Sequence, residues 1–206
     1  MTDSTLDSSP FWTFTLAAYK QEGFPAACVF LQDRLCVDVD FLLFGLFAGA
    51  NGRLLSAEEL EAVEAASSPW RRNVLQPLRA VRTWLKSQSC LSADEVRELR
   101  SGVLSREIES NGYQQLLMER AVAIPQGEPD ECSAEANAEA MASNLIACLR
   151  AAGVLSIIDA DARALAVLIR SMLPDLTADA ALAYVSAAAP NLEAHRDLAC
   201  QNTTSP

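Results

Sequence analysis

Apolar side chains recur every three to four residues along almost the whole chain, which is the spacing of one face of an α-helix. The few glycines and prolines, 8 and 9 among 206 residues, fall where these periodic runs end. Because both residue types interrupt helices, they divide the runs into successive helices. Half of the residues are apolar, so the chain can bury a sizeable core. The sequence therefore predicts an all-α fold, a compact helical bundle.

Four capping sequences predict where helices begin. Ser56–Glu59 and Ser92–Glu95 both have the serine-to-glutamate spacing of a capping box, in which each side chain accepts a backbone N–H at the helix start. Ser9–Pro10 is typical of an N-cap followed by the first helical residue. Asp38 can cap the strongly apolar helix expected over residues 41–47. We expect a helix to begin after each of these sequences.

The helix that begins at Ser92 is expected to reach Ser110. Asn111 and Gly112 favour a turn there, because both residues tolerate backbone conformations that end a helix. A shorter helix over residues 113–121 would follow that turn.

Residues 124–133, IPQGEPDECS, have the composition of a linker, with two prolines, one glycine and three acids. We therefore predict a helical domain over residues 1–123, a linker over 124–133 and an Ala-rich C-terminal helical extension over 134–206. Alanine removes little apolar area from water, so an extension of this kind would be marginally stable alone. We expect it to pack on or beside the first domain.

Charge and cysteine usage restrict the class of protein. The net charge of −11 disfavours nucleic acid as a partner, because a polyanion is repelled by such a surface. The six cysteines lack the short spacings of zinc or redox sites and suggest small, buried apolar residues. The N-terminus has no secretory signal, so the thiols are expected to stay reduced in the cytoplasm. The longest apolar run, residues 41–50, is half the length of a membrane-spanning helix.

Sequence motifs for catalysis are missing. The only histidine, His195, stands near the C-terminus, which disfavours Ser/His or Cys/His nucleophilic chemistry and a histidine-based metal site. The glycines are scattered singly, so the chain has no phosphate-binding loop or dinucleotide fingerprint. We predict no catalytic residue, metal or cofactor, and an enzyme is the less favoured class.

The most distinctive polar feature is a window between Glu64 and Asp94 that contains no carboxylate in an otherwise acidic chain. It holds five bases that fall within about one third of a helix circumference: Arg71, Arg72, Arg79, Arg82 and Lys86. Pro77 interrupts this basic helix, because its ring clashes with the carbonyl four residues earlier. The sequence leaves open whether the helix is kinked there or divided in two.

Three interpretations of the basic helix remain. Arg79, Arg82 and Lys86 could pair internally with Asp33, Asp38 or the helix over residues 58–64. They could instead form a row of guanidinium groups that binds a carboxylate or phosphate of a partner. Contact with a membrane surface through tryptophans is the least favoured interpretation.

Three acids lie between two apolar segments: Asp33, Asp38 and Asp40. Such acids could hold a magnesium ion or act as paired carboxylates, as in helical enzymes that bind diphosphates. We favour the simpler interpretation that they cap the following helix and that Asp33 pairs with an arginine.

Three blocks of the sequence carry a family resemblance: FWTFTLAAY at 11–19, CVFLQDRLCVDVDFLLFGLF at 28–47 and PWRRNVLQPLRAVRTWLK at 69–86. They resemble an uncharacterised bacterial family of short helical proteins, domain of unknown function 2390, over about residues 10–120. The resemblance implies a helical fold and a variable C-terminal part, but no activity. The residues that match its pattern are Gln32, Asp33, Asp38, Arg72, Pro77, Arg79, Arg82 and Lys86.

The chain departs from the family pattern at three positions. The family has glycine near Cys36, asparagine near Asp40 and tryptophan near Phe47. These departures add an acid at position 40.

The function predicted from sequence is a cytoplasmic interaction module that offers its basic helix to an acidic protein partner. The primary contacts would be Arg79, Arg82 and Lys86, supported by Arg71 and Arg72. The alternative is a helical enzyme or ligand-binding protein, with Asp33, Asp38 and the arginines around an anionic, phosphate or diphosphate-like molecule. The oligomeric state stays open.

Overall fold

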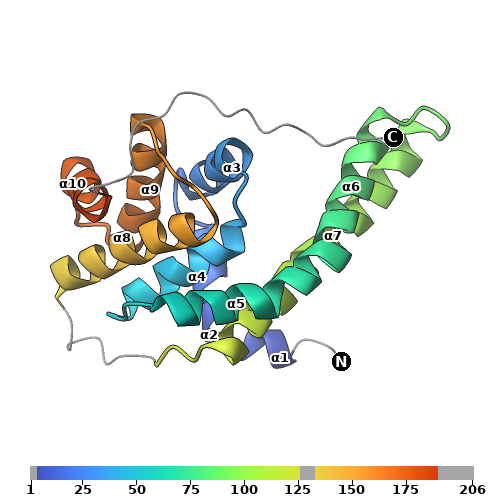
Figure 1. The fold of residues 1–206 in the computed structure, drawn as a ribbon. Helices are drawn as coiled ribbons and strands as arrows, with labels where there is room; N and C mark the ends of the chain where they lie inside the picture. The colour runs from blue at the N-terminus through green and yellow to red at the C-terminus, as the bar shows by residue number, and fades with distance from the viewer. Residues whose placement is uncertain (1–3, 126–132, 190–206) are drawn as a thin grey trace.

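The computed structural model describes residues 4–125 and 133–189, and all regular structure in these ranges is helical, which confirms the all-α prediction. The helices form a lobe and a projecting arm (Figure 1). The first helices of the lobe are α1 (Ser4–Asp7), α2 (Pro10–Ala18), α3 (Phe24–Leu35), α4 (Val39–Ala50) and α5 (Ala57–Trp70). The lobe is completed by α8 (Ala134–Ala151), α9 (Asp159–Met172) and α10 (Ala178–Ala188).

The arm is a helical hairpin that leaves the lobe at the end of α5 and returns along α7 (Figure 1). Its outgoing side consists of the π-helical turn η1 (Arg71–Leu75), α6 (Gln76–Trp84) and the 3-10 turn η2 (Leu85–Ser87). The returning helix, α7 (Ala93–Ala121), begins at the tip of the arm and ends against the lobe.

The capping sequences begin helices as predicted. The side chains of Ser56 and Ser92 accept from the backbone N–H of Glu59 and Glu95. The carboxylates of both glutamates accept in turn from the backbone N–H of the serines. The Ser9 hydroxyl accepts from the N–H of Trp12. Asp38 accepts from the N–H of Asp40, so α4 begins two residues earlier than the predicted range.

The predicted turn at Asn111 and Gly112 is wrong, because α7 continues through both residues to Ala121. The glycine serves packing: a Cβ at position 112 would lie 3.0 Å from Leu6 Cδ1 and 3.5 Å from Trp12 Cδ2. Glycine therefore lets the N-terminal segment approach α7 closely, at the modest cost of a glycine inside a helix.

Pro77 neither divides the helix nor ends it. The helical backbone runs from Ala57 through η1 into α6, and the turn before Pro77 is widened to π geometry. In that turn the N–H of Gln76 bonds to the carbonyl of Arg71, five residues back. Proline has no N–H to give to residue 73, so a wider turn accommodates the missing bond.

Helix α4 lies at the centre of the lobe, where every residue from Val39 to Gly49 is buried. It packs most extensively on α8 (Figure 1). A Cβ on Gly49 would lie 2.4 Å from the backbone of Met141, so the two helices approach as closely as backbones allow. One hydrophobic core thus joins α2–α5 with α8–α10. The predicted linker falls largely outside the described residues, so the division into a domain and an extension stays a prediction.

The cysteines differ from the sequence prediction at two positions. Cys28 and Cys148 are free and buried, as expected, but Cys90 is exposed. Cys36 is disulfide-bonded, so the prediction that every thiol is reduced is wrong at this residue. Among the described helices, none combines the length and apolar character that a membrane crossing requires.

Candidate functional site

A cavity of about 690 Å³ opens where α3, α4, α5 and the base of the arm meet the C-terminal end of α8. Its polar lining consists of Gln32, Asp38, Glu64, Arg71, Gln76 and Arg79. The volume lies within the range of small-molecule sites in proteins. This polar cavity is the candidate functional site.

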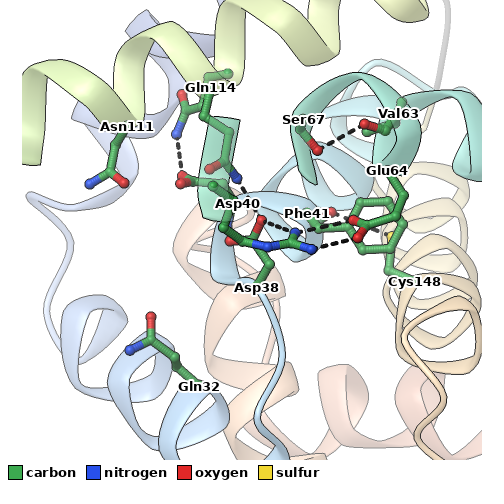
Figure 2. A network of polar contacts seen from close by, with 12 residues as sticks. Gln32, Asp38, Asp40, Phe41, Val63, Glu64, Ser67, Asn111, Gln114 and Cys148 are labelled. Atoms are coloured by element: carbon green, nitrogen blue, oxygen red, sulfur yellow. Dashed lines mark hydrogen bonds and ion pairs between the residues drawn. The ribbon is translucent and has the colours of Figure 1, made fainter. Parts of the chain in front are cut away.

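Arg71 lines the cavity and binds two acids, Asp38 and Glu64, that are labelled in Figure 2. Its Nη1 donates to Asp38 Oδ2 at 2.7 Å, and both terminal nitrogens donate to the carboxylate of Glu64. Burial favours the neutral form, but the hydrogen bonds with Glu64 and Asp38 outweigh it and raise the pKa of Arg71. Arg71 therefore stays charged, and its guanidinium is held in place by two carboxylates.

Two neighbouring acids continue this network into the core. Asp38 also accepts from Gln114 Nε2 at 2.5 Å, and Asp40 accepts from Gln115 Nε2 at 2.7 Å. Burial and the nearby charge of Asp38 raise the pKa of Asp40 to about 7. Asp40 is therefore protonated far more often near neutral pH than an ordinary aspartate.

Arg79 and Arg82 share one buried carboxylate on α7. Glu107 accepts from Arg82 Nε at 2.6 Å and from Arg79 Nε at 3.2 Å. The other contacts of Arg79 are also long, 3.5 Å to Gln32 and 3.4 Å to Asn111. The Arg79 guanidinium is therefore the more loosely held of the two, and it lines the cavity.

The structure brings together four of the residues singled out in the sequence: Asp38, Asp40, Arg71 and Arg79. The others lie elsewhere. Arg82 reaches the group only through Glu107, Arg72 and Lys86 are exposed on the arm, and Asp33 is exposed outside the cavity lining. His195 lies outside the described residues.

Internal pairing, one of the three interpretations of the basic helix, accounts for Arg71, Arg79 and Arg82. The acids expected to pair with Arg79, Arg82 and Lys86, which were Asp38 and the helix that contains Glu64, instead bind Arg71. The partner of Arg79 and Arg82 was missed, as were Gln114 and Gln115. A usable signal was their spacing, since Glu107 and Gln114 share the inner face of α7 at an interval of seven residues.

The described residues contain no group of three or more histidines, cysteines and acids arranged to hold a metal ion.

Comparison with known proteins gives one match. The model of a family described as "Protein of unknown function (DUF2390)" matches residues 10–118. No curated protein and no solved structure matches the chain. The matched residues include every polar side chain that lines the cavity, but end before α8.

Proposed function

The chain belongs to the DUF2390 family of proteins of unknown function, and from the geometry of the arm we propose that it is a protein–protein interaction module. The arm would bind an amphipathic helix of another protein that has acidic residues beside its apolar face. The observation that carries the proposal is an exposed apolar stripe on α6.

The stripe consists of Pro77, Ala80, Val81 and Trp84, all of which are exposed. Their spacing of three, four and seven residues places them on one face of the helix. Leu85, the first residue of η2, is buried. Trp84 is 59% exposed and Val81 is 47% exposed. None of the residues of α6 is fully buried, and this apolar face of the helix is left in water.

Further large apolar residues are exposed along the arm: Leu91, Leu99, Leu104 and Ile108. Single exposed apolar residues are common on proteins, but a concentration on one projecting element is typical of a surface that another protein covers. Helical partners commonly use apolar anchors spaced at three, four and seven residues.

Charge indicates the chemistry of the partner. Residues 65–93 contain no acid, whereas the whole chain carries a net charge of −11. Two exposed bases, Arg72 in η1 and Lys86 in η2, flank α6, on which the partner helix would pack. Acidic side chains on that helix would be attracted to them. Arg79 and Arg82 are occupied by Glu107, so we now assign the main contacts to Trp84 and Val81.

The test is capture with cross-linking from the cells in which the protein occurs. Wild type would be compared with the double variant Val81→Ser, Trp84→Ser and with Leu155→Ser, a matched control on the lobe that replaces a residue 83% exposed. Loss of a buried tryptophan anchor costs about 2 kcal/mol or more, roughly a 30-fold loss of affinity.

We expect one protein to be cross-linked to α6 in wild type and in the control, and to be lost from the double variant. The cross-linked segment of that protein should be an acidic amphipathic helix. Equal recovery by all three proteins, or cross-links from α6 only to this same chain, would contradict the proposal.

A further inference from the structure

The polar cavity has two ends of opposite charge. At one end, the two guanidiniums of Arg79 and Arg82 share the single carboxylate of Glu107, which leaves one positive charge. At the other end, Arg71 is shared by the carboxylates of Asp38 and Glu64, which leaves one negative charge. The cavity as a whole is close to neutral, so a simple anion gains little there.

We propose that the cavity binds a small zwitterion, with a carboxylate or phosphate at Arg79 and an ammonium group at Glu64 and Asp38. This differs from the phosphate-like anion considered from the sequence, because the acids that line the cavity are not balanced by a spare base at Arg71. The site lies apart from the exposed stripe of the arm and does not depend on a protein partner.

The positive end can accept a ligand at little cost. All three contacts of Arg79 are between 3.2 and 3.5 Å, whereas Arg82 holds Glu107 at 2.6 Å. A planar guanidinium forms two parallel bonds with a carboxylate or phosphate. Arg79 can turn from its long contacts to a ligand while Arg82 stays paired with Glu107.

The negative end offers carboxylate oxygens with unused acceptor capacity. The Glu64 side chain is 42% exposed, and the donor shown for both of its oxygens is Arg71. A carboxylate has about four lone-pair sites, so Glu64 can also accept from an ammonium group. Asp38 is held by Arg71 and Gln114 and keeps Arg71 from turning toward a ligand anion.

The amides at the sides of the cavity add hydrogen-bonding capacity for a ligand of this kind. Gln32 and Gln76 both line it, one from α3 and the other from α6. Each amide can donate and accept, so each can bind either end of a zwitterion. The cavity therefore offers matched groups for both charges and for polar atoms between them.

The experiment measures melting temperature and binding heat of the full chain with defined probes. The zwitterions are the standard α-amino acids and phosphoethanolamine. Their single-charge counterparts are acetate, inorganic phosphate, methylamine and ethanolamine. At ten times its dissociation constant, a bound zwitterion should raise the melting temperature by about 3 °C or more. The amino-acid and phosphoethanolamine arms distinguish a carboxylate from a phosphate as the anionic group.

Three variants locate the binding. Arg79→Gln should weaken it at least tenfold, whereas Arg97→Gln, which changes an exposed arginine of the arm, should leave it unchanged. Ala152→Phe fills the cavity from the exposed end of α8 without altering any charge, and should also abolish binding.

The proposal is overturned if no zwitterion raises the melting temperature more than its single-charge counterparts. It is equally overturned if a zwitterion binds Ala152→Phe and Arg79→Gln as tightly as wild type. Either failure leaves the capture experiment on the arm unaffected, because that experiment alters α6 outside the cavity.

Discussion

Replacing Glu107 by glutamine should destabilise the protein by about 2 kcal/mol. The Glu107 side chain is 8% exposed and accepts three hydrogen bonds, two from Arg82 and one from Arg79. Breaking a fully buried ion pair costs about 3–5 kcal/mol. Both arginine side chains are 27–29% exposed, so water compensates part of that loss. For a chain of this length, 2 kcal/mol corresponds to about 4–8 °C in melting temperature.

The assay is urea and thermal unfolding followed by circular dichroism. The matched control is Glu109→Gln, which breaks the exposed pair with Arg106 two residues further along the same helix. An exposed pair contributes about 0.5 kcal/mol or less, so the control should melt within about 2 °C of wild type. If both variants lose the same stability, Glu107 does not hold Arg79 and Arg82 in place. Both arginines would then be available to contact a partner protein.

Two further predictions concern the core. The pKa of Asp40 lies above its ordinary value of 3.8, so the folded protein binds more protons than the unfolded chain between about pH 4 and pH 7. The free energy of unfolding should therefore fall as pH rises through this range, and it should fall less in Asp40→Asn. Urea unfolding at pH 5 and pH 8 measures both proteins, and an equal change in the two would contradict the prediction. Gly49→Ala should lower stability by about 3 kcal/mol, because its Cβ would meet the Met141 backbone at 2.4 Å. A Cβ at Gly102, inside α7, would have no atom within 4 Å, so Gly102→Ala should instead raise stability by about 0.5–1 kcal/mol. Thermal unfolding of both glycine variants measures these changes, and equal shifts in melting temperature would contradict the prediction.

Local chemistry made much of the fold predictable. A serine followed three residues later by glutamate fixes a helix start by bonds within four residues, and both such sequences begin helices. The prediction at Gly112 was wrong because the role of this glycine is set by Leu6 and Trp12, which lie 100 or more positions earlier in the sequence. Local sequence shows that a glycine is present, but not which neighbour approaches it.

The sequence predicted which residues form the candidate site better than it predicted which of them bind one another. Arg71, Arg79 and Asp38 were all recognised as functional candidates, and the structure places them around one cavity. Glu107 was missed because its partnership with Arg79 and Arg82 depends on the register of two antiparallel helices in the arm. The π-helical turn η1 alters that register, because it takes up more residues per turn before α6 begins. The spacing of residues in the sequence does not predict this turn.

Cys36 ends α3 in an unusual backbone conformation. Its φ is 55°, the left-handed region that favours glycine at the end of a helix. A cysteine is strained in this conformation, whereas a glycine is not.

The burial of α4 by α8 has a consequence for biosynthesis. A growing chain is made from its N-terminus, and α4 emerges about 90 residues before its main packing partner. Until then its apolar residues have no covering helix on that side, and they are open to unwanted association with other chains. Final closure of the lobe must therefore wait for the second half of the protein to leave the ribosome, and a chaperone that binds apolar segments would find its target in residues 39–50 during that interval.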